Sequence, residues 1–300
     1  MFKYSMNATA QKIKRITESI ISLPTLPTVV TKMIQLVDNP KTSASSLARL
    51  IYTDQALTAR ILKLANSAYY GFPREISTVN MAIVVLGFNT VKEMGLSLSV
   101  FEVFKGSASD GGFDISRFWQ HSIACGSAAR MIARRFKRNL IGEAFVAGLL
   151  HDIGKVILKQ YMRAEFAAII EQSAHGIVAL DDAEKEIAGA THAQIGGWLA
   201  EKWNLPKIIV ESIACHHIPW EAKQDPALVA IVSVANYLCH IGQIGNSGRV
   251  NPLRPDERTW GIFRGASISL EECDLMELQT EFLLEFDKTD SMLSFMSEEL

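Results

Sequence analysis

The sequence predicts an all-α protein, and three observations carry that prediction. Apolar residues recur every three or four positions through most of the chain, as in residues 28–37, which is the spacing of one helix face. Short alternating runs closed by Asn-Gly turns, the usual signals of hairpins, are nearly absent, and the apolar run 81–86 does not alternate. The 19 glycines and 9 prolines among 300 residues leave room for long helices. A sheet of four or more strands is therefore not expected.

The helices can be placed in order from this periodicity and from stop signals. Asp38-Asn39-Pro40 is expected to end the first helix, and Asp54 is a good N-cap for the third. The predicted helices are 28–37, 43–52, 54–67, 79–86, 89–104, 115–136, 142–150, 155–161, 164–174, 180–189, 193–203, 206–215 and 226–242. Residues 245–265 are predicted to form a loop, and 270–286 a last helix.

A small, polar, glycine-rich segment, Gly106–Gly112, is the best candidate for a linker. It divides the chain into an N-terminal helical subdomain, 1–110, and a second helical subdomain, 111–242. Residues 243–300 are interpreted as a C-terminal helical extension.

Charge and composition exclude several classes of protein. Thirty basic residues nearly balance 32 acidic ones, so a protein that coats nucleic acid is not expected. The helix pair 43–67 resembles a helix-turn-helix, but Arg49, Arg60 and Lys63 are too few to dominate phosphate binding. No apolar run approaches the roughly 20 residues of a membrane span, and no signal peptide is visible. Four widely spaced cysteines favour reduced thiols and a cytoplasmic location.

All seven histidines lie beyond the linker candidate. His151-Asp152 follows an apolar helix and precedes Gly154, so both side chains are expected at a helix end, where they form a reasonable half-site for a transition metal. His216-His217 closes another helix. From spacing alone, each histidine could equally be a hydrogen-bonded core residue, a surface residue or a cap. His175 and His240 have no partner pattern and are interpreted as structural.

Longer motifs carry a resemblance to a known family. The segment Leu149–Lys155 looks like the signature of the HD superfamily of metal-dependent phosphohydrolases. Further segments resemble the HDOD family, the HD-related output domain: Leu23–Pro27, Asp54–Thr58, Leu64–Gly71, Arg74–Thr78 and Ala82–Gly87. These motifs occur in the expected order over roughly residues 20–240, and the chain is identified as a member of that family.

The resemblance implies an N-terminal helical bundle packed on an HD-type helical bundle, and a role in signal transduction. HDOD modules are generally regarded as non-catalytic, and many have lost the metal-binding residues. By similarity to HD-GYP phosphodiesterases, Lys155 matches the lysine that contacts substrate phosphate. The same similarity assigns metal-ligand positions to His121, His151, Asp152, His192, His216 and His217.

Two departures from that pattern weaken the expected site. Asn236 stands where the last ligand, an aspartate, is expected; an amide oxygen can bind a metal but brings no charge. Asp152 would then be the one carboxylate ligand. The GYP segment is missing, because Ile218-Pro219-Trp220 leads almost directly into the next helix. We expect a divalent transition metal (Fe, Mn, Zn or Ni) rather than magnesium or calcium, with partial occupancy.

Two functions from different classes remain open. The first is a cytoplasmic signalling or regulatory module that acts through contacts with partner proteins and retains most of an HD-type metal site. The alternative is a metal-dependent phosphohydrolase or phosphodiesterase of weak or narrow activity, with a phosphate-containing small molecule as substrate. In that case a metal-activated water would attack phosphorus while Lys155 neutralises phosphate charge. A transcriptional regulator that uses helices 43–67 is a more remote option.

Overall fold

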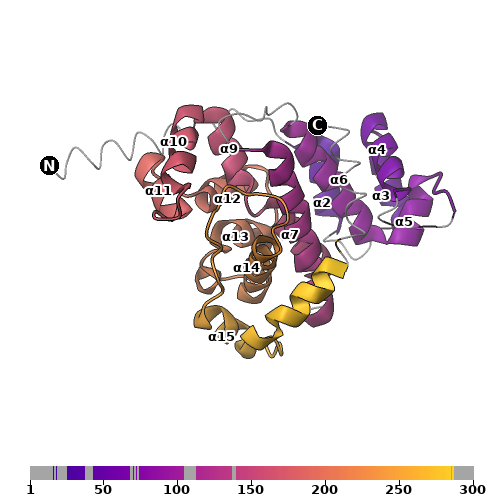
Figure 1. The fold of residues 1–300 in the computed structure, drawn as a ribbon. Coiled ribbons are helices and arrows are strands. Elements are labelled where there is room, and N and C mark those ends of the chain that lie inside the picture. The colour runs from indigo at the N-terminus through magenta and orange to yellow at the C-terminus, as the bar shows by residue number, and fades with distance from the viewer. Residues whose placement is uncertain are drawn as a thin grey trace. The chain divides into compact units, whose positions relative to one another are not determined.

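The computed structural model describes residues 26–37, 43–67, 74–104, 113–136 and 140–284, together with residues 16, 18, 70, 72 and 286. Throughout these ranges the secondary structure is helical and contains no β-strand, which confirms the predicted fold class (Figure 1). The chain divides into two compact units. One comprises Pro24–Gly106 with Leu283–Leu300, and the other Met1–Leu23 with Ser107–Phe282.

The smaller unit consists of short helices around the longer α6. Its helices are α2 (Thr28–Val37), α3 (Ala44–Ile51), α4 (Gln55–Ala65), α5 (Val79–Leu86) and α6 (Phe88–Val103). α6 contacts α2, α4 and α5, and α3 contacts α5. The side chain of Asp54 accepts a hydrogen bond from the backbone N–H of Leu57 at 2.9 Å, so it caps α4 as the sequence predicts.

Besides the helical residues 275–282, the larger unit holds the labelled helices from α7 onward. They are α7 (Ile115–Phe136), α8 (Ile141–Leu150), α9 (Ile153–Tyr161), α10 (Arg163–Ser173), α11 (Leu180–Ile187), α12 (His192–Lys202), α13 (Lys207–Cys215), α14 (Pro226–Ile241) and α15 (Glu257–Gly265), with short 3₁₀ turns at Pro219–Glu221 and Glu272–Asp274. α14 is buried along most of its length and packs against α7, α8, α13 and α15. α12 packs against α9 and α13.

Glycines allow the helices that carry the histidines to approach closely. A Cβ at Gly148 of α8 would lie 2.7 Å from the carbonyl oxygen of Cys125 in α7, and one at Gly126 would lie 2.8 Å from the carbonyl oxygen of Phe145. A Cβ at Gly154 in α9 would overlap the backbone of His192 in α12. Larger residues would push these backbones apart. The close contacts therefore bring the ends of α8 and α12 to the same place beside α7.

The structure corrects one predicted element. Residues 245–265 were predicted to be a loop, but α15 occupies the last part of that segment. Asp256 caps α15 through hydrogen bonds from the N–H groups of Arg258 and Thr259, and Trp260 and Phe263 bury its apolar side. This cap and the three-residue apolar spacing are sequence signals that the loop prediction overlooked.

Two sequence predictions fall on residues that the structure does not describe. All of the linker candidate Gly106–Gly112 lies there, although the division between the two units falls directly after Gly106. Asp38–Pro40, the expected stop of the first helix, lies there as well. Within the described ranges, no single helix is long and apolar enough to cross a membrane. The consecutive helices α5 and α6 reach that length and composition only when they are taken together, and the chain bends by 119° between them.

Candidate metal centre

The predicted ligand residues come from five helix segments of the larger unit. His121 lies on α7 and Asn236 on α14. His151 and Asp152 form the turn between α8 and α9, and His192 is the first residue of α12. His216 and His217 directly follow α13. The structure brings all seven of these residues together.

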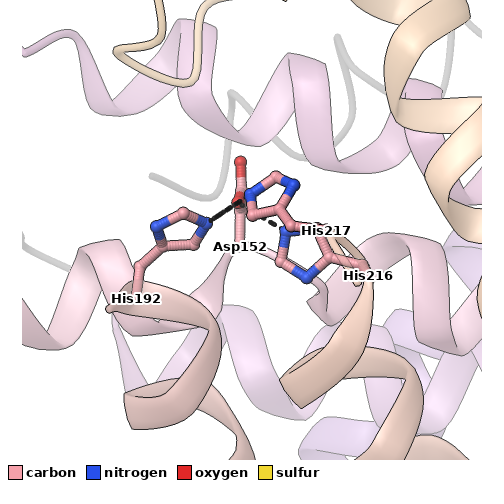
Figure 2. Close-up of side chains that lie close together, drawn as sticks. All are labelled: Asp152, His192, His216 and His217. Carbon is pink, nitrogen blue, oxygen red and sulfur yellow. Dashed lines mark hydrogen bonds and ion pairs between the residues drawn. The ribbon is translucent and has the colours of Figure 1, made fainter. Parts of the chain in front are cut away.

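Asp152 stands at the middle of the cluster, and its two oxygens face different histidines. Its Oδ2 lies 3.3 Å from His151 Nε2 and 3.9 Å from His121 Nε2. Its Oδ1 lies 3.1 Å from His192 Nε2 and 3.7 Å from His216 Nε2 (Figure 2). We call these the Oδ2 half and the Oδ1 half of the cluster. His217 belongs to the Oδ1 half, because its Nε2 lies 3.1 Å from His192 Nε2. Asn236 belongs to the Oδ2 half, because its Oδ1 lies 3.0 Å from His121 Nε2.

The cluster is almost completely closed to solvent. His151, Asp152, His192 and His216 are 0% exposed and His121 is 1% exposed. Asn236 is also buried, while the side chain of His217 is 12% exposed. A buried set of polar groups must find partners within the protein or bind an ion.

Backbone and carboxylate acceptors orient the imidazole rings. His151 Nδ1 lies 2.7 Å from the carbonyl oxygen of Gly148, and His216 Nδ1 lies 2.8 Å from that of Ile213. His192 Nδ1 lies 2.7 Å from a carboxylate oxygen of Glu184. These contacts assign an N–H to Nδ1 in each ring and turn Nε2 toward Asp152. This is the arrangement in which metal-binding histidines are usually held.

Several atoms at the centre have no protein partner. Within the described part of the chain, His151 Nε2, Asp152 Oδ1 and His216 Nε2 are buried and make no hydrogen bond. The ligand atoms of Asp152, His192, His216 and His217 all lie within 4.8 Å of one another, as do those of His121, His151 and Asp152. Buried nitrogen and oxygen atoms that converge without making a hydrogen bond are the arrangement that a bound cation satisfies. The residues therefore fit a divalent transition metal.

The protonation states follow from burial and from neighbouring charge. Burial lowers the pKa of His121 to about 3 and holds the pKa of His216 and of His217 well below the usual value. Burial would raise the pKa of Asp152, but His151 and Lys155 outweigh it and hold that pKa well below its usual range. Neutral histidines around an ionised carboxylate are the forms that bind metal.

The pKa values of two histidines are raised rather than lowered, because a carboxylate lies beside each ring. Burial lowers the pKa of His192, but Glu184 and Asp152 together outweigh burial and raise that pKa. The same balance between burial and Asp152 raises the pKa of His151 to about 10. A metal bound at either ring would have to displace a proton.

Lys155, predicted to contact a substrate phosphate if the protein is active, is turned to the cluster itself. Its Nζ donates a hydrogen bond to Asp152 Oδ2 at 2.7 Å, and the residue is 1% exposed. The ammonium group is therefore already neutralised by the central carboxylate.

Three residues that sequence reasoning missed complete the surroundings of the Oδ1 half. Glu184 accepts hydrogen bonds from both the backbone N–H and the ring of His192. Arg249 donates a hydrogen bond to Asp181, and its Nη2 lies 3.2 Å from His217 Nε2. Asp181 and Glu184 share one face of α11, so their spacing was a usable signal. Arg249 lies in a segment without regular structure, and nothing in its local sequence marks it.

The two histidines interpreted as structural lie in different surroundings. His175 is exposed. The ring centroid of His240 lies 4.8 Å from that of His121, and its Nε2 lies 3.4 Å from Ser247 Oγ. His240 is thus part of the packing around the cluster, although it is in neither of the two ligand groups around Asp152.

The fold and the cluster together define a class: an all-α protein with a buried centre of histidine and aspartate side chains suited to a transition metal. The HDOD domain family matches residues 23–219. Because this match covers more than half of the chain, the protein belongs to the HDOD family.

Known proteins similar to this chain are distant in sequence. An uncharacterized protein of Treponema pallidum (strain Nichols) is 25% identical over 223 residues, which are 74% of this chain and 43% of that protein. The chain therefore spans less than half the length of this relative.

Solved structures share the fold over nearly the whole chain. An HDOD domain protein of unknown function from Geobacter sulfurreducens has a TM-score of 0.75 at 25% identity, covering 94% of this chain and 95% of that one. A protein from Shewanella amazonensis SB2B, provisionally named a phosphohydrolase, has a TM-score of 0.72 at 24% identity and covers 94% and 98%. One from Marinobacter aquaeolei VT8, provisionally named a signal transduction protein, has a TM-score of 0.77 at 22% identity and covers 96% and 66%.

Proposed function

We propose that this chain is a cytoplasmic signal-transduction module that acts through contacts with partner proteins and carries a divalent transition metal as a buried internal component. The observation that carries the proposal is the closure of the centre around the pair Asp152–Lys155. A phosphate ester would have to reach groups that are at most 1% exposed and would have to replace the carboxylate as partner of Lys155. Catalysis needs such groups free to meet substrate.

The remaining features support the same proposal. Asn236 supplies an amide where a carboxylate would strengthen a metal site. The structural neighbour from Marinobacter aquaeolei is provisionally named a signal transduction protein. The four cysteines are free thiols in the structure, which favours a reducing compartment.

A metal-dependent phosphohydrolase is the second candidate, and one observation favours it. The histidines that the HD pattern requires converge on Asp152, and a structural neighbour is provisionally named a phosphohydrolase. A metal held by Asp152, His192 and His216 would supply Lewis-acid chemistry to a bound phosphate. In this chain Lys155 would first have to leave Asp152 to meet that phosphate.

DNA binding through α3 and α4 has little support. Arg60 forms an ion pair with Glu102 at 2.6 Å, and Arg49 donates a hydrogen bond to Ser46. These cations are thus partly engaged within their own unit. A DNA-binding surface would need more phosphate contacts than the helix pair offers.

Turnover measurements decide between the two candidates. Untagged protein loaded with Mn²⁺, Fe²⁺, Zn²⁺ or Ni²⁺ is mixed with bis(p-nitrophenyl) phosphate and with cyclic dinucleotides. The control is the double variant His151→Ala with Asp152→Ala. We expect no difference between wild type and control. Turnover near about 1 per second, at the low end of ordinary enzymes, would establish the phosphohydrolase instead.

The signalling role needs a positive result as well. Proteins cross-linked to the chain in its source cells are identified, purified singly and mixed again with the purified chain. A saturable complex of fixed stoichiometry supports the proposal. Failure of every purified candidate to bind would contradict it.

A further inference from the structure

We propose that the cluster binds one metal ion, in the Oδ1 half, and that the ammonium group of Lys155 takes the place of a second cation in the Oδ2 half. The inference deepens the metal site of the proposed function, on which it rests, by assigning the ion to one set of side chains: Asp152, His192, His216 and His217.

The Oδ2 half already has its positive partner. Lys155 Nζ lies 2.7 Å from Asp152 Oδ2, the same oxygen that faces His151 and His121. A metal bound to that oxygen at roughly 2 Å would lie within about 5 Å of the ammonium group. A dication and a monocation at that separation in a buried site repel each other strongly. Lys155 also holds the oxygen that a metal in this half would need, and we therefore assign it the place of that metal.

Asn236 contacts a second ligand atom of the Oδ2 half. Its Oδ1 lies 3.0 Å from His121 Nε2 and can accept a hydrogen bond from that nitrogen. His121 Nδ1 also lies 3.4 Å from the carbonyl oxygen of Ile244, so both ring nitrogens of His121 already face an oxygen of the protein. With Asp152 Oδ2 and His121 Nε2 engaged, His151 Nε2 is the remaining ligand atom of this half.

In the Oδ1 half, by contrast, two of the ligand atoms make no hydrogen bond with any described residue. Asp152 Oδ1 and His216 Nε2 make no hydrogen bond within the described part of the protein. His192 Nε2 lies 3.1 Å from both Asp152 Oδ1 and His217 Nε2. Glu184 takes the Nδ1–H of His192 and orients the ring so that its Nε2 faces both of these atoms. A cation between them would have three histidine nitrogens and one carboxylate oxygen as ligands.

Arg249 is compatible with that occupant. Its guanidinium approaches His217 Nε2 at 3.2 Å but is held by its hydrogen bond to Asp181. Arg249 can therefore release His217 to a metal and keep Asp181 as its partner. The ion pair between Arg249 and Asp181 does not have to break when the metal binds.

A pair of matched variants tests which half binds the ion. His121→Gln and His192→Gln each replace one buried imidazole, and both are checked for folding by circular dichroism and thermal unfolding. Metal per chain is measured by elemental analysis after Mn²⁺ or Zn²⁺ loading and removal of unbound ion. We expect about one ion per chain for wild type and His121→Gln, and at least a tenfold weaker affinity for His192→Gln. Loss of the ion from His121→Gln with retention in His192→Gln would overturn the inference.

A second comparison tests the role of Lys155. The double variant Lys155→Met with Asn236→Asp removes the ammonium and supplies a carboxylate, so a second ion should bind. With Mn²⁺, electron paramagnetic resonance should change from the signal of an isolated ion to that of two ions coupled through Asp152. Lys159→Met is the control, because Lys159 is also a buried lysine of α9 and contacts the carbonyl oxygen of Phe113 rather than the cluster.

The outcomes separate this inference from the proposed function. Two ions per wild-type chain, or one ion in the Lys155→Met and Asn236→Asp double variant, would overturn the assignment alone. Metal-free protein under every condition would overturn the metal site together with the assignment. Phosphodiester turnover would overturn the signalling proposal and leave the assignment standing.

Discussion

The two halves of the cluster share one carboxylate and differ in what satisfies it. On the Oδ2 side, Lys155 donates a hydrogen bond to Asp152, and Asn236 Oδ1 lies within hydrogen-bond distance of His121 Nε2. On the Oδ1 side, Asp152 Oδ1 and His216 Nε2 make no hydrogen bond with any described residue. This difference shows that residue type alone does not determine where a metal ion binds. A histidine is a ligand only where its lone pair is left free by its neighbours.

The largest expected effect comes from removing the shared carboxylate. His151→Ala with Asp152→Ala should abolish metal binding, measured by elemental analysis. It should also destabilise the metal-free protein by about 3–5 kcal/mol, because Lys155 would be left buried without its partner. Urea unfolding in the presence of a chelator measures this loss. Wild-type stability in the double variant would show that Lys155 reaches solvent.

Acid should destabilise the metal-free protein, and the sign follows from the lowered pKa values. In the unfolded chain a histidine takes up its proton near pH 6.5, whereas burial keeps folded His121 neutral down to about pH 3, and lowers His216 and His217 in the same direction. Each such group weakens the folded state by up to about 1.4 kcal/mol per pH unit below 6.5.

His151 and His192 act in the opposite direction at alkaline pH. Their pKa values are raised, so the stability they contribute is complete below pH 6.5 and is lost as the pH rises. Urea midpoints in a chelator at pH 5, 6.5 and 8 should therefore be highest near 6.5. A midpoint that is unchanged between pH 6.5 and 5 would contradict the burial of neutral histidines.

Glu184→Gln tests whether the metal binds in the Oδ1 half. Glu184 holds the ring of His192 and lies on the Oδ1 side, so its replacement should weaken metal binding by roughly 10- to 100-fold. Affinity is measured by competition with a chromophoric chelator. Glu186→Gln, at an exposed position of the same helix, is the matched control that should leave affinity unchanged. Equal weakening in both variants would argue against a specific role for Glu184.

Asn236→Asp alone should have a smaller effect. The new carboxylate would lie beside His121 while Lys155 still occupies the Oδ2 half, so the number of bound ions should not change. The added negative charge should tighten the existing ion by no more than about tenfold, or roughly 1.4 kcal/mol. A second ion bound to this single variant would show that Asn236 rather than Lys155 excludes it.

The smallest expected effect lies in the other unit. Asp54→Ala removes the N-cap of α4 and should cost about 1 kcal/mol of stability without changing metal affinity. Thermal unfolding and metal titration measure the two quantities separately. A change in metal affinity would reveal coupling between the cap and the cluster.

Helix positions could be predicted well from the sequence because local periodicity and capping determine them. Thr28–Val37, Val79–Leu86 and Ile115–Phe136 have the predicted boundaries. α15 was missed although Asp256 is a cap signal, and the glycine, asparagine and proline residues that precede Asp256 are signals for a loop. Local signals of opposite sign within one segment are difficult to weigh from the sequence alone.

By itself the sequence determined the all-α class, the family motifs and which residues are of metal-binding type. His151 and Asp152 could be recognised because they are neighbours in one motif. Tertiary structure alone decided which atoms of these residues remain free. Lys155 lies three residues from Asp152, and from the sequence it could contact either a substrate phosphate or that carboxylate. Because α9 is buried, the side chain of Lys155 contacts the carboxylate. Glu184 and Arg249 reach the cluster from distant segments, and a contact between distant segments depends on how the helices pack rather than on any local pattern.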